Sequence, residues 1–434
     1  MRPQRDQPKE QLATSTAVTP ASVGRFRYVF VGLLLVTMLV ASADRVNLSL
    51  LLVDIDFLLA MGIKNDPAAQ GLLMSAFVLA YGLGNVILGP GVDLIGGRRA
   101  LLAMQALWSG LAAFMGSVST FGLMMVGRSA RGAAEGPIFP TMNHLVRNWF
   151  PSEERGRANA IWLMGPSLGM AATVPILAIV IASFGWRASF FGVALLSLLV
   201  GLPVTYLCVT DKPHGNRWVG QAEVEHVERE FEAGPITSTR RWRDALLFIG
   251  DYHYWLLVAY HLASLAILWG LITWLPKYLV EARGLNVAQS GLLAAGPYLV
   301  AALSTFFFGW LSDRFSRRAP FCALQMVGGA TALWAAAVVP GAVASAALMA
   351  VAFGFWGMGA AVTHTLVQRI VPASVISTGS GIDNGIANLG AAACPALIGY
   401  MIGLSGSYSA GLMLLVAIGA LGGALVIVLA VQGY

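Results

Sequence analysis

Long apolar stretches follow one another along almost the whole chain. A run of about 20 apolar residues is long enough for a helix to cross a bilayer, and charged residues, Gly and Pro separate such runs here. Because backbone groups in lipid must bond within their own segment, the pattern predicts an all-α polytopic membrane protein. Its twelve expected transmembrane helices are 28–53, 69–91, 98–118, 120–146, 157–184, 187–209, 253–280, 288–311, 319–341, 342–367, 374–403 and 407–432.

Composition supports this prediction. The chain is 57% apolar and 11% charged, whereas a soluble domain is about a quarter charged. With both termini in the cytoplasm, the cytoplasmic segments hold 20 of the 27 Lys and Arg residues and the outer loops hold four. This bias follows the positive-inside rule, so the net charge of +6 requires no nucleic-acid partner. An excess of Arg over Lys, 23 to four, indicates a bacterium, and we expect the cytoplasmic (inner) membrane.

The polar segments divide the chain into parts. We expect a disordered cytoplasmic tail at 1–27, a six-helix bundle at 28–209, a cytoplasmic linker at 210–252 and a second six-helix bundle at 253–434. In the linker, Val224, Val227 and Phe231 share one side of a short charged helix. That helix either lies along the membrane surface or belongs to a solvated linker.

A polar turn occurs at matching places in the two halves. After the second and eighth helices, Gly-x-x-x-Asp is followed by basic residues, 220 positions apart. An Asp in a tight turn can cap a helix and pair with Arg, so each turn is predicted to latch neighbouring helices when the inner face is shut. The latch candidates are Asp93, Arg98 and Arg99 in the first turn and Asp313, Arg314 and Arg317 in the second.

The duplicated turn, the twelve helices and the central loop resemble the major facilitator superfamily, over about residues 25–434. That family is built from two six-helix halves, and the resemblance implies transport by alternating access. Two positions depart from its pattern. Leu94 stands where a basic residue usually follows the Asp, and Ser316 stands in place of the usual Gly.

Several local motifs are similar to the anion:cation symporter family, which includes bacterial transporters for galactonate, hexuronates and glucarate. They are RSARGAAEGPIFP at 128–140, NWFPSEERGR at 148–157, NGIANLGAAACP at 384–395, Gly185-Trp186-Arg187 and Trp274-Leu275-Pro276, with Tyr81 in the second helix. The resemblance implies a proton-coupled symporter that imports an organic anion, such as a sugar acid or other carboxylate.

The same resemblance implies roles for individual residues. Asp44 and Glu135 would be the proton-coupling carboxylates, while Arg45 and Arg128 would serve the substrate anion or the coupling network. In the fifth helix, the Gln that sugar-acid transporters use is replaced around 165–167, which favours an organic anion in general over a sugar acid. The further candidates for substrate binding are Tyr81, Tyr260, Asn384 and Asn388.

Elementary physics singles out the same charges. An ionised side chain at the bilayer centre costs roughly 2.5 to 3.5 kcal/mol, so these residues are expected to pair or to function. Arg128, Arg131 and Glu135 lie on one side of their helix within two turns. Asp44 and Arg45 lie at a similar depth, so the two groups are predicted to meet. A purely structural ion-pair network is the alternative, above all for Arg131, whose expected partner is Glu135.

Asp383 is a further charge within a predicted helix, and it lies outside the family pattern. It is either a second proton site or a pair with Arg369. In the tenth helix, Thr363, His364, Thr365 and Gln368 form a polar patch, in which His364 is interpreted as a hydrogen-bonded packing residue.

Other functions are weighed against these residues. A proton-driven antiporter that exports a drug or metabolite is the alternative, because residues 165–169 retain part of a Gly-Pro motif of exporters. A membrane sensor is a third interpretation. The same residues match G-x-S-x-G, but a nucleophile elbow needs a preceding strand, so no enzyme is predicted.

The three cysteines have no metal-ligand spacing. We expect no cofactor or metal, a monomer, and the bilayer, protons and a small organic anion as partners.

Overall fold

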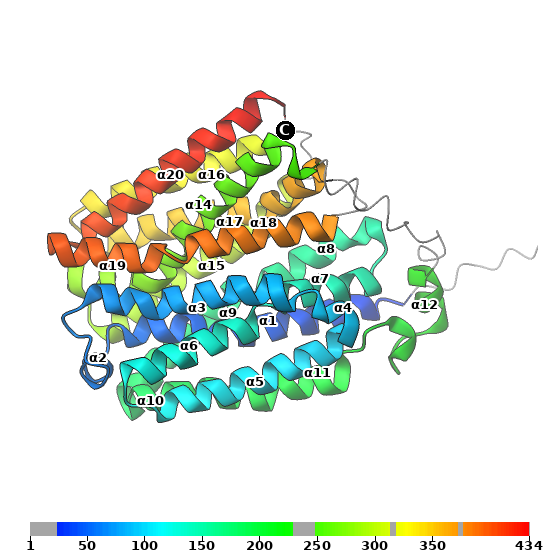
Figure 1. The fold of residues 1–434 in the computed structure, drawn as a ribbon, viewed down its shortest axis with the longest axis horizontal. Coiled ribbons are helices and arrows are strands. Elements are labelled where there is room, and N and C mark those ends of the chain that lie inside the picture. The colour runs from blue at the N-terminus through cyan, green and yellow to red at the C-terminus, as the bar shows by residue number, and fades with distance from the viewer. Residues whose placement is uncertain (1–23, 229–247, 313–317, 372–375, 434) are drawn as a thin grey trace, which may run out of the picture.

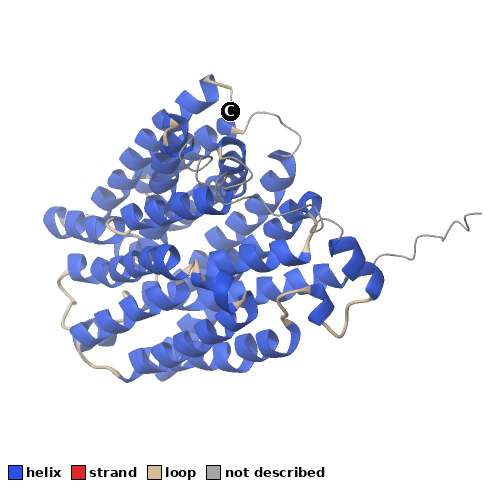
Figure 2. Ribbon diagram, turned by 45° about the vertical axis from the view of Figure 1, so that its right-hand side comes forward, coloured by secondary structure: helices blue, strands red, loops and turns tan. Residues whose placement is uncertain are grey.

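The computed structural model describes residues 24–228, 248–312, 318–371 and 376–433, and within these ranges the regular structure is helical (Figure 2). The first half contains α1 (Phe26–Leu51), α2 (Ile55–Ala60), α3 (Pro67–Leu88), α4 (Gly91–Ile95), α5 (Gly97–Ser117), α6 (Phe121–Glu135), α7 (Ile138–Trp149), α8 (Ser152–Leu163), α9 (Gly165–Phe184), α10 (Trp186–Leu196), a π-helical turn η1 (Ser197–Gly201) and α11 (Leu202–Cys208).

The linker contains η2 (Pro213–Gly215) and α12 (Gln221–Glu228). The second half contains α14 (Tyr252–Lys277), a π-helical turn η3 (Tyr278–Ala282), α15 (Val287–Ser312), α16 (Ala319–Val338), α17 (Ala342–Ile370), α18 (Ile376–Ala391), α19 (Cys394–Ser405) and α20 (Tyr408–Val431).

The helices form two bundles that lie side by side. In Figure 1, most of α1 to α11 lies in the lower part and most of α14 to α20 in the upper part, with α8 beside α18. The bundles meet where α3 packs against α18 and α19, where α9 packs against α15, and where α1 packs against α14. This interface therefore brings residues of the two sequence halves together.

Eleven helices in the described part of the chain are long and apolar enough to cross a membrane. The predicted helix at 120–146 is the exception, because it is split into α6 and α7, which have 15 and 12 residues. α6 carries Arg128, Arg131 and Glu135, which lower its apolar character. The prediction of an all-α polytopic membrane protein is confirmed.

Proline explains the breaks within three predicted helices. Pro137 lies between α6 and α7, Pro166 is at the start of α9, and Pro395 is at the start of α19. Proline has no backbone N–H and clashes with the preceding turn, so it is accommodated at a helix start. The two consecutive helices of each pair continue the same path through their bundle (Figure 1).

Glycines set the distance between α3 and α6. A side chain at Gly132 would place its Cβ 3.0 Å from the carbonyl carbon of Phe77, and one at Gly84 would place it 3.0 Å from Cα of Ala133. Small residues allow membrane helices to approach this closely. The charged α6 is consequently held with its backbone directly against α3.

The linker helix α12 docks on the first bundle. Val227 is fully buried, and the buried carboxylate of Glu223 accepts hydrogen bonds from the backbone N–H groups of Phe26 (3.2 Å) and Arg27 (2.9 Å) at the start of α1. The predicted short helix is therefore present and packed against protein. Phe231 and residues 1–23 of the predicted tail lie outside the described residues, and the domain boundaries remain a prediction.

Candidate functional site

Five charged side chains meet in the interior of the first bundle. Asp44 and Arg45 come from α1, and Arg128, Arg131 and Glu135 come from α6. Each is at most 6% exposed. The predicted meeting of the two groups of charges is confirmed, and their geometry decides which charges pair.

Asp44 is shared by two guanidinium groups. Arg128 Nη1 donates to Asp44 Oδ2 at 2.6 Å, and Arg131 Nε lies 3.3 Å from the same oxygen. Arg131 Nε is 3.9 Å from Glu135 Oε2. The expected partner of Arg131 one turn away is thus the more distant one, because α1 places a carboxylate closer than the helix itself does.

Arg45 pairs with Glu135. Its Nε donates to Glu135 Oε1 at 2.9 Å, and its Nη2 donates to the same oxygen. Charged hydrogen bonds of this kind are roughly twice as strong as neutral ones. The adjacent residues Asp44 and Arg45 therefore have separate partners on α6.

Backbone and ring contacts fix the two arginines of α6. Arg131 Nη1 donates to the carbonyl of Trp108 on α5 at 2.7 Å. Arg128 Nε donates to the carbonyl of Leu73 on α3 at 3.4 Å, and its guanidinium carbon lies 4.6 Å from the centre of the Phe77 ring. Both side chains are held entirely by helices of the first bundle.

Arg45 instead reaches the second bundle. Its guanidinium carbon lies 5.5 Å from the ring centre of Tyr81 on α3 and 5.5 Å from that of Trp269 on α14. Aromatic faces attract cations at this distance. Arg45 is thus the member of the cluster that lies at the interface between the bundles.

A chain of amides continues from Trp269. Its indole Nε1 donates to Asn388 Oδ1 at 3.0 Å, and Asn388 Nδ2 donates to Asn384 Oδ1 at 3.1 Å. Asn85 of α3 donates to the same Asn384 oxygen at 3.0 Å. The structure therefore brings Tyr81, Asn384 and Asn388 into one continuous polar and aromatic region with Arg45.

Tyr260 lies in a different network. Its hydroxyl bonds with Gln325 of α16 and lies 3.1 Å from Thr363 Oγ1 of α17, while Gln325 Nε2 donates to Ser264 at 2.7 Å. All of these side chains are buried within the second bundle. The structure does not bring Tyr260 into the charged cluster.

The first predicted latch is only partly described. Arg98 donates its backbone N–H to Asp211 Oδ1 at 2.8 Å, and its Nη2 donates to the Tyr206 carbonyl at 2.7 Å. These contacts join the start of α5 to the end of α11 within one bundle, and Arg99 is exposed. The side chain of Asp93 and the whole of Asp313, Arg314 and Arg317 lie outside the described residues.

Asp383 and its predicted partner also differ from expectation. Its Oδ2 lies 2.8 Å from Nδ1 of His261 on α14. The predicted pair with Arg369 is therefore replaced by a hydrogen bond to His261. The side chains of His364, Thr365 and Gln368 lie outside the described residues.

The bundles also touch at the end that the predicted orientation places outside. Lys277, which is 2% exposed, donates to Gln70 Oε1 at 2.6 Å, and Ser75 Oγ accepts from the backbone N–H of Ala396 at 3.2 Å. Gly71 packs against the Pro395 carbonyl. Contacts between α3, α14 and α19 thus close this end.

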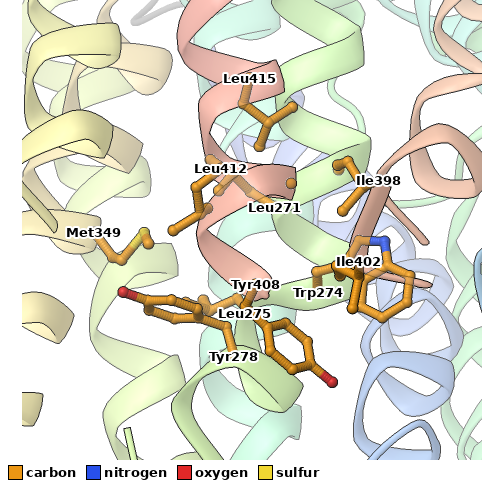
Figure 3. A pocket seen from close by; sticks show the side chains of 12 residues that line it. Leu271, Trp274, Leu275, Tyr278, Met349, Ile398, Ile402, Tyr408, Leu412 and Leu415 are labelled. Atoms are coloured by element: carbon orange, nitrogen blue, oxygen red, sulfur yellow. The ribbon is translucent and has the colours of Figure 1, made fainter. Parts of the chain in front are cut away.

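Near this end lies a small apolar cavity, with room for about one water molecule, between α14, α17, α19 and α20. Figure 3 shows Trp274, Tyr278 and Tyr408 among its lining side chains, and none of the lining residues is charged. An anion would find no counter-charge there, so this cavity is separate from the candidate site.

Sequence reasoning missed several contributors to these contacts, among them Phe77, Trp108 and Asp211. Phe77 stands one turn before Tyr81 on the same helix face, a spacing that could have indicated its role. The Trp108 carbonyl and Asp211 gave no signal, because a backbone acceptor and a linker carboxylate carry no spacing pattern.

Two helical bundles that pack side by side, with a cluster of acidic and basic side chains buried in one of them, are the architecture of a multi-pass membrane transporter. Residues 33–292 and 279–432 match the model of the Major Facilitator Superfamily. The chain belongs to this superfamily, and it is a transporter and not an enzyme.

Several transporters are similar in sequence to this protein along nearly its whole chain. A D-galactonate transporter of Escherichia coli O6:H1 is 27% identical over 88% of this chain and 91% of its own length. A probable sulfoacetate transporter of Cupriavidus necator is 28% identical over 91% and 92%. A probable galactarate/D-glucarate transporter of Bacillus subtilis is 26% identical over 92% and 90%. The predicted resemblance to organic-anion transporters of this superfamily is confirmed.

A solved structure shares the fold. The inward-facing, occupied form of a bacterial homolog of the human lysosomal transporter Spinster superposes with a TM-score of 0.70 at 18% identity, covering 94% of this chain and 97% of that chain. At this level of identity the similarity concerns the fold alone.

Proposed function

We propose that the protein is a proton-coupled symporter that imports an organic anion by alternating access. The observation that carries this proposal is the charge balance of the buried cluster. Three guanidinium groups face two carboxylates, so the five described side chains sum to +1 when all are ionised. A buried uncompensated charge is costly, and an anionic substrate would compensate it.

Arg45 is the best placed residue to receive that anion. It lies at the interface between the bundles, whereas Arg128 and Arg131 are held within the first bundle. A guanidinium group binds a carboxylate with two parallel hydrogen bonds. Tyr81, Trp269, Asn384 and Asn388 would surround the rest of the substrate.

Proton coupling follows from the pairing of Arg45 with Glu135. A nearby guanidinium favours the charged form of a carboxylate, and burial disfavours it. When a substrate anion takes Arg45 as its partner, Glu135 loses its counter-charge and binds a proton. Asp44 would do the same when Arg128 and Arg131 change position, so binding of the anion and of protons is linked.

The names of the relatives support an acid as the substrate. D-Galactonate, sulfoacetate and galactarate/D-glucarate are all anions at neutral pH. They share a carboxylate but differ in their hydroxyl groups, and sulfoacetate has none. This common feature fits a site built around arginine.

The antiporter interpretation gains no support from the Gly-Pro motif. Cβ atoms at Gly165 and Gly169 would lie 2.9 Å from the Leu35 carbonyl oxygen and 2.8 Å from Cα of Leu39. Close packing of α9 against α1 therefore accounts for these glycines.

We also propose that the protein is a monomer in the bacterial inner membrane, with both termini in the cytoplasm. The Asp-Arg turns are proposed to act as latches at the inner face.

The test is uptake into proteoliposomes driven by a pH gradient. D-Galactonate, D-glucarate, sulfoacetate and benzoate would be compared, with Glu135→Gln as the variant and Glu225→Gln, an exposed residue of α12, as the matched control. We expect at least one acid to accumulate in the wild type and the control. Glu135→Gln should accumulate less acid than the wild type at the same pH difference and retain exchange of labelled for unlabelled acid. Proton-driven efflux of a lipophilic cation without acid uptake would refute the proposal.

A further inference from the structure

A second pair of titratable side chains is buried in the other bundle. Asp383 on α18 is 2% exposed and His261 on α14 is 7% exposed. Asp383 Oδ2 and His261 Nδ1 are 2.8 Å apart. The charged cluster described above lies in the first bundle and does not use this pair.

The pair lies in the cytoplasmic half of the predicted membrane thickness, whose hydrocarbon core is about 30 Å. His261 is nine residues from the start of α14 and Asp383 is seven from the start of α18, which corresponds to about 14 Å and about 10 Å along their helices. Both helices begin at the predicted cytoplasmic end. A proton held there is closer to the cytoplasm than to the outer face.

The surroundings of Asp383 contain few other ionisable groups in the described part. The ionisable neighbours of Asp383 on α14 include Tyr254 and Tyr260. The Tyr254 hydroxyl donates to the Gly379 carbonyl at 2.7 Å. From α3, the uncharged Asn85 donates to Asn384, the residue next to Asp383, at 3.0 Å. The charged residue described on α17 is Arg369, which is exposed in the last turn.

The hydrogen bonding of Asp383 is that of a carboxyl group whose charge is incompletely stabilised. Oδ2 bonds with His261, while the buried Oδ1 has no hydrogen-bond partner among the described residues. A buried polar atom without a partner is costly. An imidazole nitrogen and a carboxyl oxygen can each carry a proton, so the pair offers two neighbouring positions at which a proton can bind.

The position next to Asp383 links the pair to the bundle interface. Asn384 accepts a hydrogen bond from Asn85 of the first bundle and another from Asn388, which contacts Trp269 beside Arg45. A change in the position of α18 therefore alters contacts between bundles. Conversely, movement of the bundles alters the environment of Asp383.

We propose that His261 and Asp383 form a second proton-coupling site, which binds one proton and releases it in each transport cycle. This inference rests on the proposed symport and assigns an additional proton to it. The step changes no bond except that between the proton and the pair. Two coupled sites in different bundles would give the carrier two protons per substrate, more than the single negative charge of D-galactonate.

The decisive measurement is the steady-state accumulation ratio in proteoliposomes. With the membrane potential clamped at zero and a pH difference of one unit, each coupled proton multiplies the limiting ratio tenfold. The probe is labelled D-galactonate, replaced by whichever acid of the screen above the wild type transports. Asp383→Asn should lower the ratio about tenfold and retain exchange, and His261→Gln should show the same loss.

An exposed pair provides the matched control. His214 and Glu228 in the linker lie 3.2 Å apart, with side chains that are 58% and 47% exposed. His214→Gln and Glu228→Gln should leave the ratio unchanged. They reproduce the chemical change of the test variants outside the membrane.

Different outcomes separate the two proposals. If Glu135→Gln lowers the ratio and Asp383→Asn keeps the wild-type ratio, the pair is structural and the symport proposal stands. If the wild-type ratio does not depend on the pH difference, symport itself fails.

A measurement that needs no substrate tests the pair directly. Infrared difference spectra of the wild type between pH 5 and 8 should contain a carboxyl band that Asp383→Asn or His261→Gln removes or shifts, and identical spectra would overturn the inference.

Discussion

Replacement of Gly71 by Ala tests whether the contact between α3 and α19 closes the outer end. A Cβ on Gly71 would lie 2.7 Å from the carbonyl carbon of Pro395 and 2.8 Å from Cα of Ala396. Ordinary carbon contacts begin at about 3.5 Å, so the helices would have to separate by about 0.7 to 0.8 Å. The obstructing atoms are backbone, and no rotamer change can relieve them.

The energetic consequence can be estimated. Overpacking costs about 1 to 3 kcal/mol, which corresponds to a shift of about 5- to 150-fold in the equilibrium between closed and open outer ends. The assay is the rate at which a membrane-impermeant maleimide labels a cysteine introduced at Ser75, in a background without the native cysteines. Gly71→Ala should increase that rate by a similar factor.

The matched control is Gly192→Ala in α10, because a Cβ at Gly192 meets no atom within 4 Å. Its labelling rate should equal that of the background protein, with unchanged or slightly raised thermal stability since Ala favours helix. An unchanged rate in Gly71→Ala, in protein that still binds and exchanges the acid, would show that this contact does not close the outer end.

Three further predictions concern contacts at the ends and centre of the bundles. Lys277→Met leaves Gln70 Oε1 without its donor and should weaken the closure of the outer end by about 1 to 3 kcal/mol. The same maleimide assay should then show faster labelling, and an unchanged rate would contradict this prediction. Glu223→Ala removes the hydrogen-bond acceptor at the start of α1 and should destabilise the protein by about 0.5 to 2 kcal/mol. Its melting temperature in detergent should be lower than that of the control Glu225→Ala. Trp269→Phe keeps a ring beside Arg45 and removes the N–H that donates to Asn388. The dissociation constant of the acid should therefore rise about tenfold, which corresponds to a loss of about 1.4 kcal/mol of binding free energy. An unchanged dissociation constant in titration calorimetry would contradict this.

The helices could be predicted from the sequence because each is a local property of an apolar run. Depth along the helices also sufficed to predict that Asp44 and Arg45 meet Arg128 and Glu135. The individual pairs could not be predicted in the same way. Spacing on one helix suggested Glu135 for Arg131, but α1 supplies Asp44 at 3.3 Å, closer than Glu135 at 3.9 Å.

Asp383 shows the same limit more strongly. The sequence left a pair with Arg369 as one of two alternatives, whereas the observed partner, His261, is 122 residues away in the chain. Packing of α14 against α18 decides that contact, and no periodicity within either helix encodes which residues will face each other. Tyr260 was predicted to bind substrate for its residue type, and its contacts with α16 and α17 likewise depend on the assembled bundle.

The contacts of the three arginines explain why the surplus positive charge should act at the interface between the bundles. Arg131 is bound to Asp44 and to a carbonyl of α5, and Arg128 to Asp44 and a carbonyl of α3, so both have partners that move with them. Arg45 has one carboxylate partner and shares its guanidinium face with a ring from each bundle. Relative movement of the bundles must therefore change the surroundings of Arg45 more than those of the other two. An anion bound there would be sensitive to that movement, which is the physical requirement for coupling its binding to alternating access.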